Sequence, residues 1–526
     1  METMYLKNLS YEEKYNLARE VKTPAKILAV LAQDIDPRIR EAVAWNENTP
    51  VEALVMLAKD GDETRYAVAQ ANVPEEVLIQ LASDDYLKVR CAVASNSNTP
   101  PFILATLAKD EDIRVRSAVA ENKNTLAEML AMLAKDKELL VRSAVAGNKN
   151  TPIELLSVLA QDEKWSVREQ VALNESTSAD VLAMLAKDEK FHIRTLVAGN
   201  ANTPRSTLVM LAKDVNIDVR CAVAENKNTP IELLAVLAQD EDYWVRCAVA
   251  ANENTSADVL AMLASDKICW VRSDVARNKS TPIEILAVLA QDENRSVREQ
   301  VALNESTTAD VLTMLTQDEK IGVRCAVANN RNTPAEVFAM LAKDEDCYIR
   351  RIVAENKNTP IEILAVLAQD EDRWVRWAVA NNSNTPAEVL AMLAKDENRD
   401  VRNAVARNKN TPIEILTVLA QDENWSVREQ VALNESTTTE LLAVLANDDV
   451  YDVHTAVATN GNTSADVLAK LAKDEYIIVR CAVAENENTP KEALVTLSKD
   501  NNEWVRIRAE EALKECKEKG KTRIER

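Results

Sequence analysis

Apolar and polar positions repeat with a constant period along almost the whole chain. An arginine that follows Val or Ile marks the period. It stands at Arg90, recurs at Arg116 and at the same interval as far as Arg428, and is replaced once, by His454, before the series ends at Arg506. A fixed 26-residue period is typical of a solenoid, and the series predicts about nineteen stacked repeats.

The repeat NTPIEILAVLAQDEDRWVRWAVANN, from Asn358 to Asn382, begins with a helix start signal. Thr-Pro-x-Glu predicts Thr359 as the N-cap, Pro360 in the first turn and Glu362 closing a capping box. All but two of the fifteen prolines occupy this register, which a helix tolerates. The apolar residues that follow predict a broad buried face, made of Ile361, Ile363, Leu364, Val366 and Leu367.

A second, shorter helical segment, VRWAVA, completes the repeat and is expected to bury Val375, Ala378 and Val379. We expect Asp370 to end the first helix and to cap the second. Asn382 is expected to stop the second helix in the left-handed conformation or to hold the loop with its amide. Two short helices cannot cover their own apolar faces, so the repeats must stack.

The ends of the chain depart from the repeat. We expect an N-terminal cap over residues 1–22, the tandem helical solenoid over residues 23–506 and a polar C-terminal capping helix over residues 507–526. No linker or second domain is evident. The prediction is an all-α fold in which each unit contributes two helices.

A longer period lies over the short one. TPIELLSVLAQDEKWSVREQVALNEST begins at Thr151 and has near copies that begin at Thr281 and Thr411. This spacing equals five repeats and indicates duplication of a block. Within the block, glutamine replaces an alanine of the predicted core at Gln170, Gln300 and Gln430. Either the glutamine marks a bend or a site, or it was inherited when the block was duplicated.

The composition of the chain disfavours some classes of binding partner. The net charge of −22 would repel phosphate backbones and anionic lipid. The first residues contain no apolar signal region and no stretch reaches membrane-spanning length, so a soluble, cytoplasmic protein is expected. Five cysteines share one register, where equivalent atoms lie roughly 8–10 Å apart, too far for a disulfide; they are Cys91, Cys221, Cys247, Cys325 and Cys481.

The unit D-x5-R-x-A-V-A-x-N-x-N-T-P-x-E-L-L-x-x-L-A resembles the leucine-rich repeat variant, a bacterial repeat of the same length. The resemblance covers roughly Thr23 to Arg506. It implies alternating α and 3₁₀ helices wound into a right-handed superhelix. The repeat is also similar to HEAT-type repeats, which share an Asp and an Arg six residues apart. An amino-terminal cysteine cluster of the variant family holds an iron–sulfur centre, but the first cysteine here is Cys91, so we expect no cofactor.

Two polar series could carry chemistry. One pairs an aspartate with an arginine six residues later, and we interpret it as a structural ladder along the stack rather than an anion clamp; its representatives are Asp240, Arg246, Asp344, Arg350, Asp370 and Arg376. The other is the recurrent asparagine seen at Asn226, Asn356 and Asn486. Turn chemistry explains it better than base recognition, because a base code must vary between repeats.

Materials for catalysis are scarce. The two histidines, His192 and His454, stand ten repeats apart, and the six glycines are isolated, so no phosphate-binding loop is possible. No metal site is expected, because no cysteine or histidine cluster has ligand spacing.

The residues before each Val-Arg pair vary freely and contain most of the aromatics. These side chains either pack over the neighbouring repeat or form a binding stripe. Exchange with Ser, Arg, Asp and Gly at the same positions favours the stripe, because close packing would resist it. The expected partner-binding residues are Trp165, Tyr243, Trp244, Trp270, Tyr348, Trp374, Trp377 and Trp425.

The sequence therefore favours a non-catalytic scaffold that binds a protein or peptide, with no membrane and no small-molecule substrate. The first alternative is a nucleic-acid-binding solenoid, which would need a basic stripe. Arg295, Arg373 and Arg399 are outnumbered in the variable positions by acids and aromatics. The second alternative is an enzyme related to HEAT-type lyases, which would need a reactive constellation.

Overall fold

A computed structural model describes residue 6 and residues 9–522, with side chains as far as Lys514. Residues 1–5 and 7–8 of the expected N-terminal cap and residues 523–526 of the expected C-terminal helix lie outside the described residues. Across the described part of the chain every regular element is an α-helix, which confirms the all-α repeat fold. The chain forms two compact units, Met1–Leu263 and Ala264–Arg526, and each is built in the same way.

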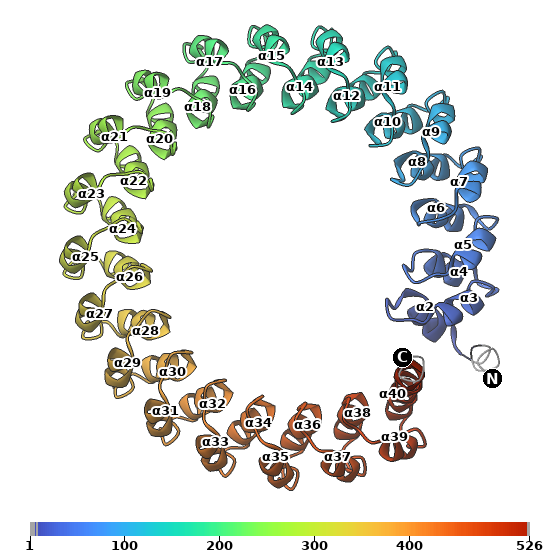
Figure 1. The fold of residues 1–526 in the computed structure, drawn as a ribbon, viewed down its shortest axis with the longest axis vertical. Coiled ribbons are helices and arrows are strands. Elements are labelled where there is room, and N and C mark those ends of the chain that lie inside the picture. Colours follow the sequence, from blue (N-terminus) through green and yellow to red (C-terminus); the bar gives the residue numbers. More distant parts are fainter. Residues whose placement is uncertain (1–5, 7–8, 523–526) are drawn as a thin grey trace. The chain divides into compact units, whose positions relative to one another are not determined.

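Each repeat contributes an odd-numbered helix, then an even-numbered one. In each unit the two kinds form separate layers, and the even-numbered layer lies on the concave side (Figure 1). Typical odd- and even-numbered helices have seven and nine residues, as in α29 (Ile361–Leu367) and α30 (Arg373–Asn381). The expectation that the second segment is shorter was therefore wrong. The expected 3₁₀ segments were wrong as well, since the described elements of both layers are α-helical.

The odd-numbered helices of the first unit are α3 (Ala25–Leu31), α5 (Val51–Leu57), α7 (Glu75–Leu81), α9 (Pro101–Leu107), α11 (Ala127–Leu133), α13 (Ile153–Leu159), α15 (Ala179–Leu185), α17 (Arg205–Leu211), α19 (Ile231–Leu237) and α21 (Ala257–Leu263). Its even-numbered helices are α2 (Tyr11–Arg19), α4 (Pro37–Ala44), α6 (Asp62–Gln70), α8 (Leu87–Ser95), α10 (Ile113–Glu121), α12 (Leu139–Gly147), α14 (Trp165–Leu173), α16 (Phe191–Gly199), α18 (Ile217–Glu225) and α20 (Tyr243–Ala251).

In the second unit the odd-numbered helices besides α29 are α23 (Ile283–Leu289), α25 (Ala309–Leu315), α27 (Ala335–Leu341), α31 (Ala387–Leu393), α33 (Ile413–Leu419), α35 (Thr439–Leu445), α37 (Ala465–Leu471) and α39 (Lys491–Leu497). The even-numbered helices besides α30 are α22 (Cys269–Arg277), α24 (Arg295–Leu303), α26 (Ile321–Asn329), α28 (Cys347–Glu355), α32 (Arg399–Arg407), α34 (Trp425–Leu433), α36 (Tyr451–Thr459), α38 (Ile477–Glu485) and α40 (Glu503–Thr522).

The core lies between the two layers. Leu364 and Leu367 of α29 are buried, and so are Val375 and Val379 of α30, as the apolar pattern predicts. The broad apolar face expected for the first helix was wrong in part. Ile361 and Val366 are more than half exposed, because a two-turn helix turns only one side toward the even-numbered layer.

The odd-numbered helices do not begin as the sequence predicts. Pro360 rather than Thr359 is the N-cap of α29, and no side chain caps that helix. The Thr359 hydroxyl instead donates to the carbonyl of Val353, 2.5 Å away, and ties the loop to the preceding helix. Ser178 and Ser464, which replace the proline in two repeats, accept a hydrogen bond from the third helical N–H, whereas Thr308 at the same register does not. The capping box expected at Thr359 and Glu362 was therefore wrong.

The turn between the two helices also differs from expectation. Asp370 caps neither helix, since α29 ends at Leu367 and Asp372 is the N-cap of α30. Asp370 holds the intervening turn by accepting a hydrogen bond from the Asp372 backbone N–H, 2.9 Å away. The described residues include no non-glycine residue with positive φ, so Asn382 does not end α30 in the left-handed conformation.

Candidate functional site

A ladder of arginines and aspartates joins successive repeats. Arg350 of α28 donates from Nε and Nη2 to the two carboxylate oxygens of Asp370, at 2.6 and 2.9 Å. Its Nη1 donates to the main-chain carbonyl of Asp344, 2.8 Å away. Each aspartate thus receives the guanidinium of the preceding repeat on its carboxylate. Only its carbonyl meets the arginine six residues later.

The same geometry recurs throughout the ladder residues singled out in the sequence. Arg220 donates to the carboxylate of Asp240 at 2.7 and 3.0 Å, and Arg246 donates to the Asp240 carbonyl at 2.8 Å. Arg376 donates to the Asp370 carbonyl at 2.9 Å and to the carboxylate of Asp396 at 2.6 and 3.0 Å.

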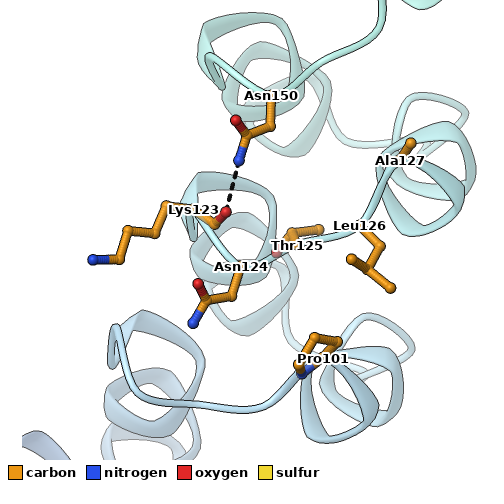
Figure 2. Close-up of a pocket in the computed structure, with 7 residues that line it drawn as sticks. All are labelled: Pro101, Lys123, Asn124, Thr125, Leu126, Ala127 and Asn150. Carbon is orange, nitrogen blue, oxygen red and sulfur yellow. Dashed lines mark hydrogen bonds between the residues drawn. The ribbon is translucent and has the colours of Figure 1, made fainter.

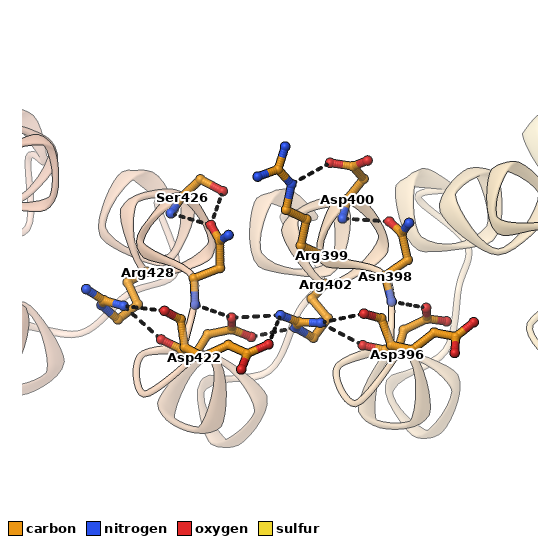
Figure 3. Close-up of polar contacts among 11 residues, drawn as sticks. Asp396, Asn398, Arg399, Asp400, Arg402, Asp422, Ser426 and Arg428 are labelled. Atoms are coloured by element: carbon orange, nitrogen blue, oxygen red, sulfur yellow. Dashed lines mark hydrogen bonds and ion pairs between the residues drawn. The ribbon is translucent and has the colours of Figure 1, made fainter.

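Figure 3 shows one stretch of the ladder at atomic detail. Arg402 donates to the carboxylate of Asp422 at 2.6 and 3.0 Å and to the Asp396 carbonyl at 2.9 Å. The Asp422 carbonyl in turn accepts from Arg428. Because these polar groups are paired within the stack, the ladder fixes how one even-numbered helix stands against the next.

The lowered pKa of the ladder aspartate Asp370 agrees with this geometry. Burial by itself would raise the pKa of Asp370, but hydrogen bonds from Arg350 and from the Asp372 backbone N–H hold that pKa below its ordinary value. The side chains of Arg350 and Asp370 are only 10% and 8% exposed. A paired, largely buried guanidinium has little freedom to hold an outside anion. At the one histidine of the ladder, His454 contacts the Asp474 carboxylate at 2.8 Å and the Asp448 carbonyl at 2.7 Å.

The recurrent asparagine forms a second ladder at the C-terminal ends of the even-numbered helices. Asn382 donates from Nδ2 to the carbonyls of Ala354 and Asn356, at 2.7 and 3.0 Å, while its Oδ1 accepts from the backbone N–H of Asn384. Asn226 is placed in the same way, with Nδ2 2.6 Å from the Ala198 carbonyl. Both ends of the buried amide are engaged, which supports the structural interpretation of this position.

In most loops a further asparagine reaches back one repeat. Figure 2 shows Asn150 donating to the Lys123 carbonyl, 2.6 Å away. Beside it lies a hollow of about 550 Å³, bordered by Pro101, Asn124 and Leu126. Leu126 stands at the register usually held by proline and is half exposed. The hollow is open and has one cationic side chain, so it offers little for recognition.

The predicted aromatic stripe lies on the even-numbered helices, at their first and second residues and, for Trp377, at the fifth residue of α30. Six of its members are 43% to 62% exposed, namely Trp165, Trp244, Trp270, Tyr348, Trp374 and Trp425. Tyr243 and Trp377 are half-buried. Such exposure disfavours the alternative that these rings fill gaps between neighbouring repeats, because packed rings lose nearly all of their accessible surface.

Ring contacts divide the stripe into local clusters. In the first unit, Tyr243 and Trp244 lie with ring centroids 4.9 Å apart. His192 of α16 packs edge-on against Trp165 at 5.6 Å and against Phe191 at 4.9 Å.

In the second unit, Trp374 and Trp377 meet edge-to-face at 6.1 Å, and the Arg373 guanidinium lies 5.0 Å from the Trp374 ring. Arg351 lies 5.2 Å from the ring of Tyr348 on the adjacent α28. Aromatic rings and exposed guanidinium groups therefore share one face of these neighbouring helices.

Two further positions on this face vary between repeats, the fifth and the ninth residues of the even-numbered helices; of these the sequence singled out only Trp377, at the fifth. The ninth is exposed and ranges from Leu173 and Leu303 to Arg277 and Gly147. Its variation between repeats was the available signal. The three glutamines are the sixth residues of α14, α24 and α34 and are half-buried rather than in the core, so their description as core substitutions was wrong. Gln300 accepts a hydrogen bond from Arg277.

The described residues offer little reactive chemistry. Burial raises the pKa of the Cys221 thiol to about 11 and also raises the pKa of Cys91 and Cys325, so these thiols stay protonated at neutral pH. No group of three metal-binding side chains occurs among the described residues. Within the same residues, no helix is both long enough and apolar enough to cross a membrane.

Comparison with known proteins finds similarity in two of the repeats. The family model of the leucine-rich repeat variant matches residues 87–112 and 217–242. A solved leucine-rich repeat variant with a novel repetitive structural motif is 28% identical, with 43% of this chain and 88% of that chain covered and a TM-score of 0.35.

Larger helical solenoids are similar at lower identity. Yeast importin-beta (Kap95p) is 11% identical over 96% of this chain and 87% of its own, with a TM-score of 0.33. Kap95p in a structure with RanGDP is 12% identical over the same shares, with a TM-score of 0.33. No curated protein sequence matches the chain. The chain is thus a helical repeat protein, and two of its 26-residue repeats are similar to the leucine-rich repeat variant.

Proposed function

We propose that this protein is a non-catalytic scaffold that binds a protein or peptide along the exposed face of its even-numbered helices. The observation that carries the proposal is the exposure of large aromatic side chains at variable positions of an otherwise repetitive surface, as at Trp244 and Trp374. Tryptophan, tyrosine and arginine supply much of the binding energy of protein interfaces. Exposed to water, the same rings contribute little to folding.

The ladders support this function indirectly. They hold adjacent even-numbered helices in register through hydrogen bonds such as Arg350–Asp370, so the rings lie on rigid elements. A preorganised surface loses less conformational entropy on binding. The acidic surplus of the chain also makes protein a better partner than nucleic acid. A cytoplasmic location belongs to the same proposal, and so does a bacterial source, which the family resemblance implies.

The test compares partner capture by three forms of the full chain. Trp374→Ala removes a ring of the stripe, whereas Phe102→Ala removes a ring of similar exposure from α9 in the odd-numbered layer. We expect a partner captured by the native protein to bind Phe102→Ala normally. Its affinity for Trp374→Ala should fall by at least about 2 kcal/mol, the loss typical of a hot spot.

Equal loss in both variants, or loss in neither, would contradict the proposal. Binding of random DNA or RNA tests the nucleic-acid alternative. At physiological salt we expect a dissociation constant weaker than about 10⁻⁴ M. Micromolar binding with a steep salt dependence would favour that alternative.

A further inference from the structure

A hollow of about 440 Å³ opens on the exposed face of α10, α12 and α14 in the first unit. Small side chains create it, notably Ser117, Ser143 and Gly147. The Ser143 hydroxyl is buried and has no hydrogen-bond partner among the described residues. Carboxylates and an amide border the hollow, and they belong to Glu121, Glu169 and Gln170.

The duplicated block allows this hollow to be compared with its counterpart five repeats later. There Arg277 stands in place of Gly147, and Gln300 corresponds to Gln170. The Arg277 Nε donates to Gln300 Oε1, 3.2 Å away. Its Nη1 lies 3.1 Å from the carboxylate of Asp274, in the place of Ala144. In the second copy, therefore, the chain's own guanidinium is bound at this position.

The third copy repeats the arrangement with a different acceptor. Arg407 takes the place of Gly147, and its Nη2 donates to Asn381 Oδ1, 2.9 Å away. Asn381 corresponds to Glu121, which borders the hollow of the first copy. The two acceptors that hold arginine in the later copies thus have counterparts, Gln170 and Glu121, around the hollow.

Only the first copy lacks the arginine. A Cβ atom on Gly147 would lie 3.1 Å from Gln170 Oε1, so the glycine leaves that oxygen facing open space. Glu121 and Glu169 add negative charge next to it. A charge-assisted hydrogen bond to a guanidinium is stronger than one to a neutral donor, and the carboxylate and the amide can share its several N–H groups.

We infer that this hollow binds the guanidinium group of an arginine in a partner protein, where the later copies hold Arg277 and Arg407. The inference deepens the proposed function, because it adds a specific contact on the same face as the aromatic stripe. It places a requirement on the partner: a surface arginine within reach of the even-numbered helices.

The test uses a small probe, so its failure can be told apart from failure of the scaffold proposal. N-acetyl-arginine-N-methylamide is titrated against the full chain by saturation-transfer NMR, with the neutral citrulline analogue as matched ligand. We expect the arginine compound to bind and the citrulline analogue to bind at least about tenfold more weakly, a difference of about 1.4 kcal/mol. Equal binding of the two, or no binding of the arginine compound, would overturn the inference.

Variants locate the binding. Gly147→Arg fills the hollow with the chain's own guanidinium and should weaken probe binding at least about tenfold. Gly199→Arg is the matched control, because Gly199 ends α16 as Gly147 ends α12, and a Cβ there meets nothing within 4 Å. It should bind like the native chain. Weakening by Gly199→Arg as strong as that by Gly147→Arg would indicate general charge repulsion and refute the site.

Two further arms keep the inference falsifiable if Gly147→Arg disturbs the fold. Gln170→Ala restores the alanine found at this register elsewhere and should weaken binding, whereas Arg277→Gly should create a second probe site. An alanine peptide with one central arginine should bind at least as well as the capped amino acid. Exclusion of that peptide would overturn the assignment to a protein partner.

Discussion

Trp374 and Arg376 lie two residues apart in α30, yet they belong to regions under different constraints. The Arg376 guanidinium has the Asp396 carboxylate and the Asp370 carbonyl as fixed partners. Trp374 is 44% exposed and touches mainly Trp377 and Arg373. In other repeats the arginine recurs almost unchanged, whereas the position of Trp374 varies widely and includes Ser, Asp, Gly, Tyr and Trp.

The comparison teaches why some positions are constant between repeats and others vary. A residue type recurs at a position when its side chain has several partners inside the stack. Replacing a ladder residue leaves a buried polar group without its partner in the next repeat. Replacing a residue of the exposed face removes at most a contact near the surface, such as that of Trp165 with His192 of the next repeat. Duplication of repeats could therefore lengthen the solenoid with its ladders intact, while the residues of the exposed face changed.

The largest effect is expected in the core beneath both regions. Leu364→Ala should destabilise the chain by about 2–5 kcal/mol, because Leu364 is fully buried and the substitution leaves a cavity. Val366→Ala in the same helix is the control and should change stability by less than about 0.5 kcal/mol, since Val366 is 55% exposed. Urea unfolding followed by circular dichroism gives both values. Similar losses would mean that the odd-numbered layer is covered on its outer side.

A ladder arginine should matter less than the core but clearly more than an exposed one. Arg350→Ala leaves the Asp370 carboxylate without its ion partner and should cost about 1–3 kcal/mol. Arg373→Ala, which removes an exposed guanidinium from α30, should lower the free energy of unfolding by less than about 0.5 kcal/mol. If Arg350→Ala melts like the native chain but abolishes binding of inorganic anions, the arginine row is an anion site and the comparison fails.

The ladder also predicts a pH dependence. The pKa of Asp370 is lower in the folded chain than its ordinary value of about 3.9. Its contribution to stability is therefore present above that value and is lost as pH falls through the folded-state pKa. Asp370→Asn should be less stable than the native chain by about 1 kcal/mol at neutral pH. The difference should shrink as the pH is lowered below about 4.

Asp372→Asn is the control for this pH profile. Asp372 is the N-cap of α30, where asparagine caps as well as aspartate, so the stability of this variant should differ little from that of the native chain at every pH. A difference between Asp370→Asn and the native chain that persists at low pH would show that shape rather than charge matters at this position.

A smaller effect is expected where the ladder already departs from arginine. His454 contacts one oxygen of Asp474 and the Asp448 carbonyl. His454→Arg should restore the bidentate pair and leave stability unchanged or raise it by up to about 1 kcal/mol. Thermal melts at neutral pH measure the change. A marked loss would mean that neighbouring side chains have adapted to the histidine.

The smallest change in stability is expected from the stripe. Trp374→Ala should shift the free energy of unfolding by less than about 0.5 kcal/mol, as is usual for exposed residues. A loss near 3–5 kcal/mol, typical of a buried ring, would place Trp374 in the core. The binding surface would then lie elsewhere on the repeat.

The sequence by itself determined the repeat, its helical character and the buried positions nearest each helix centre. The 26-residue period, the prolines at one register and residues such as Leu364 and Val379 suffice for that, because local propensity and apolar spacing act within one repeat. The exposure expected for variable aromatics such as Trp374 also follows from comparing repeats with one another.

Only the tertiary structure decided which groups pair. Asp370 and Arg376 look like partners in the sequence, but the carboxylate of Asp370 binds Arg350, twenty residues earlier in the preceding repeat. The start signal at Thr359 likewise became a hydrogen bond to the Val353 carbonyl. The hollow beside Gly147 required three helices of successive repeats to be placed together. Stacking brings side chains of adjacent repeats closer than many residues of the same repeat, and no pattern within a single repeat specifies those contacts.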